Sequence, residues 1–571
     1  MKKTLAIILA VATVLSFASG CGSPSGVADP SPSASSSVDS PVNPSGSENI
    51  ELPQVTLSWY LVWNGSSATA PDDIANNPVA DAIREKLGIT FDFQYATSAE
   101  SDLLNTIFAS GDLPDMINSA YWGGLDPTTM IFKKAAKEGQ LYAFNDVIDQ
   151  FPNVKRSLTE GVSKDFREFD LEDPAFSGNL YILPWQTVLT QEDTYNPAVS
   201  IFAREDILNE LGVKPNSVTT SEEIYELLLK IKNGNFKDAN GNAVIPSGCW
   251  SNGWPVDLLF NSYSNIGFAT GYSLENGRYT LNSMTENMDK STLFMRKLIS
   301  QGLLDPECFR QTDSVAREKL ANGTIAVLPS MFSINDSFFP ITLYMDHPEM
   351  RYVPLGPIMD GNGTYYMPGQ VNLAGRAGTP CNVITKACKN PLSALAFLDF
   401  SATPEGQKLL YYGIEGVHHT LVDGQPRLTE EWLDIYNNDK KRLYDDGLCS
   451  SYTWAVALDC RSSVFGEASP GASVNEVDPD YALITQMYPL VFKDGIRITY
   501  LASGYPNKDD IDALVMQAAN LDLIQSAYFA NSDEEALKII NGIRDQLIKG
   551  GINDFLDYIN EQTRGRDDIL T

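Results

Sequence analysis

The sequence predicts an α/β protein with two lobes, on three observations. The chain has 571 residues, of which 43% are hydrophobic, and one core rarely accommodates that length. Its first globular stretch alternates strand, helix and strand, which is typical of a parallel βαβ unit. A second strand and helix unit begins near residue 201. No fixed-period repeat is present, so a solenoid or a propeller is excluded.

The first lobe should begin with a strand over residues 56–63, where apolar and polar residues alternate and β-branched and aromatic side chains are frequent. A proline near its start and Gly88 at its end delimit a helix over 78–87, and residues 89–95 alternate again as a strand. The same spacings predict further elements in chain order: a helix over 103–109, a strand over 115–118 and a helix over 131–138.

The second unit has its own boundary signals. Residues 201–203 are predicted as a strand, and Thr220 with Glu223 forms a capping box that opens an amphipathic helix. A short β-rich run follows at 324–328 and a helix at 391–400. The C-terminal third is largely helical, and its last strongly amphipathic helix starts at Ser532.

The N-terminus has the features of an export signal over residues 1–20, with an apolar run at 5–17. That run is shorter than the ~20 residues that span a bilayer. Ala18, Ser19 and Gly20 followed by Cys21 resemble a bacterial lipobox, in which the cysteine is diacylated, although ordinary cleavage before Cys21 remains an alternative. We expect a lipidated Cys21 and a disordered tether over residues 21–50, because Ser, Pro and Gly fill 18 of the 28 positions 22–49. The protein is then held on the outer face of the cytoplasmic membrane.

The charge and the cysteines exclude some functions. Asp and Glu number 73 against 41 Lys and Arg, so the formal net charge is −32. A general nucleic-acid binder needs clustered basic residues and is therefore not expected. The six cysteines after Cys21 form no C-x-x-C pair and permit either disulfides or buried free thiols. They are Cys249, Cys308, Cys381, Cys388, Cys449 and Cys460.

A series of short motifs resembles the extracellular solute-binding proteins that serve sugar-importing transporters. In chain order they are residues 109–115, 139–141 with 151–153, 178–184, 202–213, 322–326 and 397–406. Residues 412–418 are similar to a large lipoprotein subgroup labelled as aldouronate or complex-polysaccharide binders. The resemblance implies a type II periplasmic-binding-protein-like fold, in which each lobe is a sheet flanked by helices and a hinge joins the lobes. It places residues 51–184 with 322–400 in lobe 1, and residues 185–321 with 401–571 in lobe 2.

One loop departs from the pattern of these relatives. Some of them have an EF-hand-like calcium loop, and this chain begins it with Asp238, Asn240 and Asn242. The later carboxylates are absent, whereas calcium prefers six to eight oxygen ligands. We expect the hairpin to form without bound calcium, and no cofactor otherwise.

Tryptophan is the residue type that best marks a sugar site, because flat aromatic faces cover the C–H side of a sugar ring. Ligands of open α/β sheets lie beyond the carboxyl ends of strands. Trp63, Trp122 and Trp185 follow predicted strands there, and residues 249–254 form a second aromatic turn. For each tryptophan, a place in the core is the alternative. The expected ligand-binding residues are Trp63, Asn64, Tyr121, Trp122, Trp185, Trp250, Asn252, Trp254, Trp454 and His418.

The resemblance implies a monomeric binding protein that captures an oligosaccharide and delivers it to a membrane permease driven by a separate ATPase. It implies no catalysis, and no G-x-S-x-G, H-E-x-x-H or P-loop motif is present. Two alternatives stay open. An oligopeptide binder of the same fold is one, and a secreted polysaccharide hydrolase, which needs only two carboxylates, is the other.

Overall fold

The computed structural model describes most of the chain after residue 51. The described residues are 52–62, 69–96, 100–121, 126–160, 176–185, 187, 199–215, 217–250, 253–256, 259, 271–331, 343, 346–356, 380–459, 465 and 496–570. The predicted export signal, Cys21 and the tether lie outside them. Among the described residues, no helix has the length and apolar character needed to span a bilayer.

A five-stranded sheet forms the centre of the first core, which comprises described residues between 55 and 183 and between 381 and 465. Its order is β2-β1-β3-β11-β4, with β1 parallel to both β2 and β3 and with β11 antiparallel to its two neighbours. The predicted parallel βαβ unit is thereby confirmed. The strands are β1 (Val55–Leu61), β2 (Ile89–Tyr95), β3 (Met116–Ala120), β4 (Leu183–Pro184) and β11 (Pro380–Ile384).

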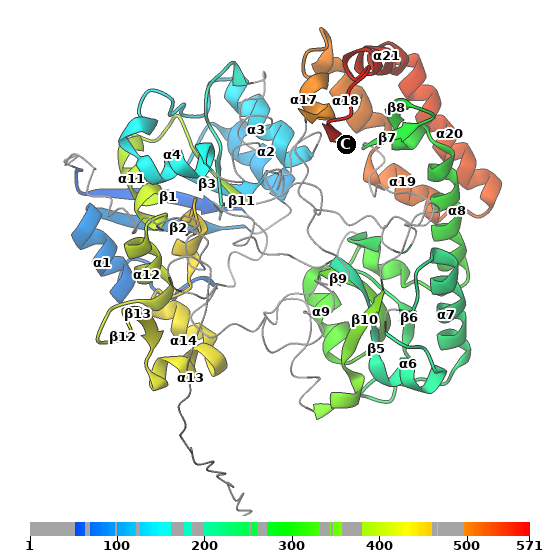
Figure 1. The fold of residues 1–571 in the computed structure, drawn as a ribbon, viewed down its shortest axis with the longest axis horizontal. Coiled ribbons are helices and arrows are strands. Elements are labelled where there is room, and N and C mark those ends of the chain that lie inside the picture. The colour runs from blue at the N-terminus through cyan, green and yellow to red at the C-terminus, as the bar shows by residue number, and fades with distance from the viewer. Residues whose placement is uncertain are drawn as a thin grey trace, which may run out of the picture. The chain divides into compact units, whose positions relative to one another are not determined.

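Local signals set the boundaries of the helix between β1 and β2. Asn77 accepts a hydrogen bond from the Ala80 N–H, a proline follows it, and Gly88 ends the helix in the left-handed region at φ 70°. The helices that contribute to the first core appear in Figure 1. They are α1 (Pro78–Leu87), α2 (Glu100–Ser110), α3 (Pro127–Lys137), α4 (Pro152–Thr159), α11 (Pro391–Ser401), α12 (Pro404–Tyr412), α13 (Glu430–Asn438) and α14 (Lys440–Asp445). The hairpin of β12 (His419–Val422) and β13 (Gln425–Leu428) precedes α13.

Aromatic rings fill one side of the first core. The Trp59 ring lies 5.1 Å from Phe93, 5.6 Å from Phe91 and 6.2 Å from Phe397 of α11, measured between centroids. Tyr452 adds a fifth ring 5.4 Å from Phe93. Trp59 is fully buried, so it belongs to the core, as its alternation with Leu57 and Leu61 suggests.

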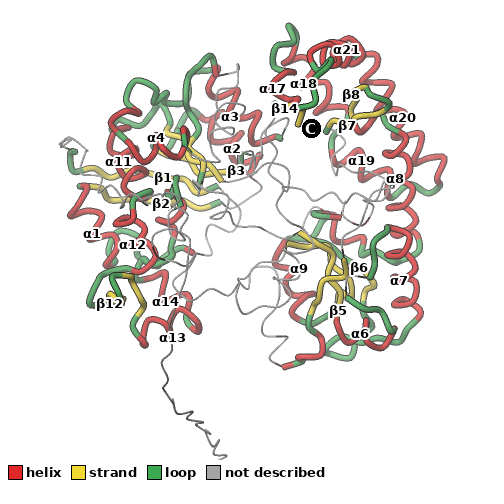
Figure 2. Tube along the Cα trace, viewed as in Figure 1, coloured by secondary structure: helices red, strands yellow, loops and turns green. Residues whose placement is uncertain are grey.

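A four-stranded sheet forms the centre of the second core, which comprises described residues between 201 and 355 and between 498 and 559. Its order is β10-β5-β9-β6, and Figure 2 shows the strands surrounded by helices. The strands are β5 (Val199–Arg204), β6 (Ile245–Ser247), β9 (Ile325–Met331) and β10 (Tyr352–Gly356), with α6 (Glu205–Leu211), α7 (Ser221–Asn233), α8 (Glu286–Ser300) and α9 (Asp313–Ala321) beside them. The capping box of Thr220 and Glu223 is present at the start of α7 and confirms that prediction.

The C-terminal segment adds a helical layer to the second core. Helices α19 and α20 both contact α8, and Ser532 caps α20 by accepting the Glu535 N–H. The helices of this segment are α17 (Ile498–Ala502), α18 (Lys508–Ala518), α19 (Leu521–Tyr528), α20 (Asp533–Lys549) and α21 (Ile552–Gln562), and its short strands are β14 (Ile496–Arg497) and β15 (Ile569–Leu570). The earlier hairpin of β7 (Tyr272–Glu275) and β8 (Arg278–Leu281) contacts α21 through β8.

Two predicted lobe boundaries differ from the structure. The sequence-based division places residues 322–400 in lobe 1, but β9 pairs with β5 and β6, and β10 pairs with β5, in the second sheet. It places residues after 401 in lobe 2, but the side chains of Leu410, Trp432 and Tyr452 are buried in the first core. The reason is physical: a strand pattern shows that a segment is extended, not which sheet it joins.

One of the permitted disulfides is present among the described residues. Cys249 and Cys308 are bonded, with Cα atoms 5.5 Å apart. Within the described residues, no disulfide joins Cys381, Cys388 or Cys449, and Cys460 lies outside them. Burial raises the pKa of the Cys388 thiol to about 12, so this thiol stays protonated and unreactive at neutral pH.

Candidate functional site

The carboxyl ends of four strands lie on one edge of the first sheet. β1, β2 and β3 run parallel, and β4 has the same direction because β11 is antiparallel to both β3 and β4. Trp185 follows β4 directly at this edge. In the sequence, Trp63 and Asn64 follow β1 and Trp122 follows β3. These three residues lie outside the described part of the chain.

An aromatic pair stands at the end of β4. The indole rings of Trp185 and Trp454 stack with their centroids 5.0 Å apart and their planes at 30°. Trp454 belongs to the short helix η11 (Ser451–Ala455), which is far from β4 in the sequence. Both side chains are half-buried. The Trp185 Nε1–H donates to the Thr453 carbonyl at 2.7 Å, so the pair is held by a hydrogen bond as well as by stacking.

Buried amides connect this pair to the centre of the sheet. The Asn118 Nδ2 on β3 donates to the Asn382 Oδ1 on β11 at 3.1 Å. The Asn382 Nδ2 in turn donates to the Trp454 carbonyl at 2.8 Å. Both asparagines are buried, and buried amides are expensive to leave unpaired. The position of Trp454 is therefore fixed from inside the sheet.

Three predicted ligand residues, Tyr121, Trp250 and His418, are buried. Tyr121 is almost fully buried at the end of β3. Trp250 is buried in the second core, and its Nε1–H donates to the Ser330 hydroxyl at 2.9 Å. Both side chains therefore belong to the interior. Trp254, by contrast, is 39% exposed, and Asn252 lies outside the described residues.

His418 is the third of these buried residues, and its ring supports the loop before β12. Its Nδ1 accepts the Ile414 N–H at 2.8 Å, and its Nε2 lies 3.3 Å from Asp446. The edge of the ring meets Trp432 at 4.4 Å between centroids. Burial lowers the pKa of His418, and Asp446 opposes that effect only in part. A neutral imidazole that accepts a backbone hydrogen bond holds this loop in place.

Motifs that carried the sequence resemblance also have structural roles. The Asp115 carboxylate accepts hydrogen bonds from the Ser58 N–H at 2.8 Å and from its hydroxyl at 2.9 Å, which joins β1 to the start of β3. Asp399 accepts the Asn153 and Val154 N–H groups at the start of α4. Burial raises the pKa of Asp399, and these hydrogen bonds offset part of the rise.

A surface hollow of about 530 Å³ lies elsewhere, between the β7–β8 hairpin and the end of α21. Two of the arginines that line it already pair with carboxylates. Arg278 contacts Asp557 at 2.6 Å, and Arg566 contacts Asp568 at 2.6 Å. We therefore do not assign the ligand to it.

Comparison with known proteins identifies the family. The profile of the bacterial extracellular solute-binding proteins matches residues 66–408. The chain belongs to this family. Over 272 residues it is 26% identical to the fructooligosaccharide ABC transporter substrate-binding protein of Streptococcus pneumoniae, which covers 46% of this chain and 48% of that protein. The matched region thus spans about half the length of that relative.

Two further relatives agree in sequence or in fold. The polygalacturonan/rhamnogalacturonan-binding protein of Bacillus subtilis is 23% identical over 378 residues, which is 64% of this chain and 67% of that protein. The crystal structure of the alginate-binding protein AlgQ2 without calcium ion superposes with a TM-score of 0.60 at 17% identity, covering 89% of this chain and 98% of the other. The predicted two-lobed binding-protein fold is confirmed.

The EF-hand-like loop of this family member does not fit calcium. The Asp238 carboxylate accepts the N–H groups of Asn240 and Asn242 at 2.9 and 2.8 Å and the Thr324 hydroxyl at 3.2 Å. Burial opposes the charge of Asp238, but these hydrogen bonds outweigh it and hold its pKa below the usual value. The described residues contain no group of three or more metal-ligating side chains. The predicted hairpin does form, with Lys237 bridged to Ala243.

Proposed function

We propose that this family member is an extracellular substrate-binding lipoprotein, which captures an oligosaccharide and delivers it to the permease of an ABC importer with a separate ATPase. The stacked pair of Trp185 and Trp454 at the carboxyl edge of the first sheet carries the proposal. Relatives named for binding fructooligosaccharides and polygalacturonan support the ligand class.

The pair suits a sugar for a physical reason. The C–H face of a sugar ring packs on an indole face, and rings that are already fixed lose little conformational entropy on binding. The Trp185 ring donates to the Thr453 carbonyl, and the Asn382 amide donates to the Trp454 backbone carbonyl, so both residues are positioned before ligand arrives. We include Trp254 in the proposed ligand-binding residues and keep Trp63, Asn64, Trp122 and Asn252 as predictions from sequence position. Tyr121, Trp250 and His418 are not included.

The remaining parts of the proposal concern location and chemistry. Cys21 carries the lipid, and residues 22–49 tether a monomeric binding protein to the outer face of the membrane. The protein does no chemistry, so a bound oligosaccharide leaves unchanged. Relatives named as binding proteins support this.

Calorimetric titration of the purified protein tests the function. The ligands are neutral fructooligosaccharides, acidic oligogalacturonides and a peptide pool, each checked for cleavage afterwards. Saturable binding of an intact oligosaccharide is expected. Binding of peptides alone, or recovery of cleaved sugar, would replace the proposal with one of its two alternatives.

A matched pair of variants tests the site. Trp454→Ala should weaken oligosaccharide binding about tenfold, which corresponds to about 1.4 kcal/mol, because one stacking face is lost. Leu421→Ala removes another exposed apolar side chain, on β12, and should bind as the unmodified protein does. Equal affinities for all three proteins would remove Trp454 from the site.

A further inference from the structure

The EF-hand-like hairpin belongs to a segment of the second core, residues 237–249, that is fastened at both of its ends. The hairpin, in which Lys237 is bridged to Ala243, leads directly into β6. β6 is the last strand of its sheet and is only three residues long. So short a strand forms few ladder hydrogen bonds, and its position therefore depends on how the flanking chain is held.

A buried arginine fastens the hairpin end of this segment. Arg204 is the last residue of β5 and is only 1% exposed. Its Nη1 donates to the Lys237 carbonyl at 2.8 Å and to the Gly323 carbonyl at 2.7 Å. The first carbonyl lies at the start of the hairpin, and the second lies in the turn between α9 and β9. One guanidinium thus joins the hairpin to the body of the core.

The charge of Arg204 is balanced beside it. Its Nε and Nη2 donate to the two carboxylate oxygens of Asp206 at 3.1 and 2.5 Å. Together with the two carbonyl contacts, these bonds use four of the five N–H groups of a guanidinium. A buried cation without partners would be strongly destabilising, whereas the planar fork of arginine suits a bidentate carboxylate. The cation is therefore a stable part of the interior.

The hairpin also binds the α9–β9 turn through its own groups. The Ala239 N–H donates to the Asn322 carbonyl at 3.0 Å, and the Thr324 hydroxyl donates to the Asp238 carboxylate at 3.2 Å. No Asp or Glu follows Asp238 in the sequence until Asp257. A divalent ion would thus meet a single carboxylate that is already hydrogen-bonded, although calcium prefers six to eight oxygen ligands.

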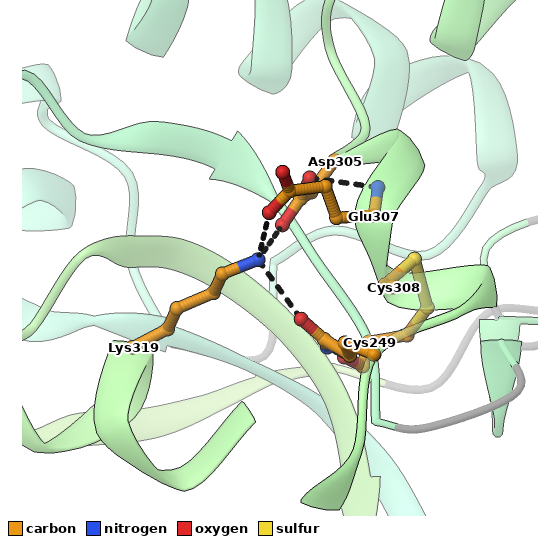
Figure 3. The surroundings of a disulfide bond; sticks show 6 residues. Cys249, Asp305, Glu307, Cys308 and Lys319 are labelled. Atoms are coloured by element: carbon orange, nitrogen blue, oxygen red, sulfur yellow. Dashed lines mark hydrogen bonds and ion pairs between the residues drawn. A yellow bond between two sulfur atoms is a disulfide. The ribbon is translucent and has the colours of Figure 1, made fainter. Parts of the chain in front are cut away.

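A second cation fastens the far end of the segment, beside the disulfide (Figure 3). The Lys319 Nζ donates to Asp305 at 2.6 Å and to the Gln311 side-chain oxygen at 2.9 Å. The Gln311 Nε2 donates to the Cys249 carbonyl at 2.7 Å, and Cys249 is bonded to Cys308. Lys319 belongs to α9, whose C-terminal end leads into the turn described above. Both fastenings therefore meet on one helix.

We propose that the guanidinium of Arg204 serves, in place of a metal ion, as the cation that fastens the EF-hand-like hairpin to the second core. Backbone carbonyls are among the ligands that calcium takes in such loops, and here an arginine binds two of them while Asp206 balances its charge. Arginine keeps its charge at physiological pH, and a chelator cannot remove it. Arg204 is thus a positioning residue that holds the hairpin at any calcium concentration. This inference does not depend on the ligand of the protein.

Hydrogen–deuterium exchange of the full chain, read by mass spectrometry, tests the fastening. Arg204→Ala should make the backbone amides of residues 237–245 exchange about tenfold faster, because the hairpin loses its link to the core. Millimolar guanidinium should restore most of the protection by filling the place of the side chain, and calcium should restore none. Unchanged exchange at 237–245 in Arg204→Ala would overturn the inference. Calcium-dependent protection of these amides in the unmodified protein would overturn it as well.

Arg296→Ala is the matched control. Arg296 is 16% exposed and donates to two carbonyls and one carboxylate elsewhere in the second core, those of Ala530, Asn531 and Asp533. Its removal should lower the melting temperature but leave exchange at 237–245 unchanged. Equal loosening of the hairpin in both alanine variants would show that only global stability is measured, and would overturn the inference.

Arg204→Lys keeps the test decisive if Arg204→Ala does not fold. The lysine retains a positive charge for Asp206, but its ammonium lacks the rigid fork that reaches two carbonyls and a carboxylate together. We expect the amides of 237–245 to exchange about threefold faster than in the unmodified protein. Equal exchange in Arg204→Lys and the unmodified protein would show that the guanidinium does not hold the hairpin.

Discussion

At the scale of single residues, the proposed site depends on side chains that touch no ligand. Asn382 is the clearest case, because its two amide atoms pair with Asn118 on one side and with the Trp454 carbonyl on the other. The Trp185 and Trp454 rings are partly exposed, but Trp454 is held in position by a buried residue of the sheet. Such residues have no sequence signature, since an asparagine in a strand is equally typical of an exposed edge.

Replacing Asn382 tests this view. Asn382→Ala leaves the Trp454 carbonyl and the Asn118 amide without their partner, and we expect the free energy of unfolding to fall by about 1–3 kcal/mol. Urea denaturation measures the change. Asn438→Ala removes an exposed amide that contacts Asp434 and should cost less than about 0.5 kcal/mol. Equal costs for the two variants would contradict the role of the buried amide network.

At the scale of elements, the loop between α12 and β12 depends on a neutral histidine. Burial lowers the pKa of both His418 and His419. The pKa of each histidine is therefore lower in the folded state than in the unfolded state. The neutral histidines stabilise the fold above about pH 6.5, and this stabilisation is lost as the pH falls through their folded-state pKa.

We therefore expect the free energy of unfolding to fall between pH 7.5 and pH 5.5. His418→Gln removes one of the titrating groups and should give a flatter profile with lower stability at pH 7.5. Chemical denaturation across the pH series measures both. His347→Gln, at a partly exposed position, is the control and should keep the slope of the unmodified protein. If His418→Gln left the pH dependence of the free energy of unfolding unchanged, that result would contradict the stabilising role of neutral His418.

The EF-hand-like hairpin leads to another prediction at this scale. Because its own N–H groups already occupy the Asp238 carboxylate, neither millimolar calcium nor EDTA should shift the melting temperature. Asp238→Asn weakens the hydrogen bonds that this charged acceptor receives, and we expect a lower melting temperature with the same insensitivity to calcium. Differential scanning fluorimetry compares all conditions. A calcium-dependent rise that Asp238→Asn abolishes would show that the loop does bind the ion.

The elements also show how far sequence reasoning reaches. Strand alternation, proline starts and glycine stops predicted β1, α1, β2 and α7 closely, because these signals act within a few residues of one another. The pairing of β9 and β10 with β5 was missed because it depends on contacts between distant segments. The same limit applies to the site. Trp185 was predicted from its place after a strand, whereas the role of Asn382 depends on its contacts with Asn118 and Trp454, which are distant in the sequence.

At the scale of the whole molecule, the proposed anchor determines where the protein acts. Cys21→Ser removes the only sulfur that the lipobox offers for acylation, so we expect the protein to move from the membrane pellet to the soluble extracellular fraction. Immunoblotting of the fractions and metabolic labelling with a palmitate analogue measure this. Cys449→Ser changes a cysteine packed against the first core and should leave both readouts unchanged. Retention of Cys21→Ser in the pellet would overturn the lipid anchor.

The Cys249–Cys308 bond links folding to the cell compartment. It closes a loop across 59 residues, and chain-entropy reasoning gives such a bond about 4 kcal/mol of stabilisation. Disulfides persist in oxidising surroundings and are rare in the cytosol. In the proposed export, the second core lacks this contribution before translocation, and oxidation adds it to the folded state only once the chain is outside the cell.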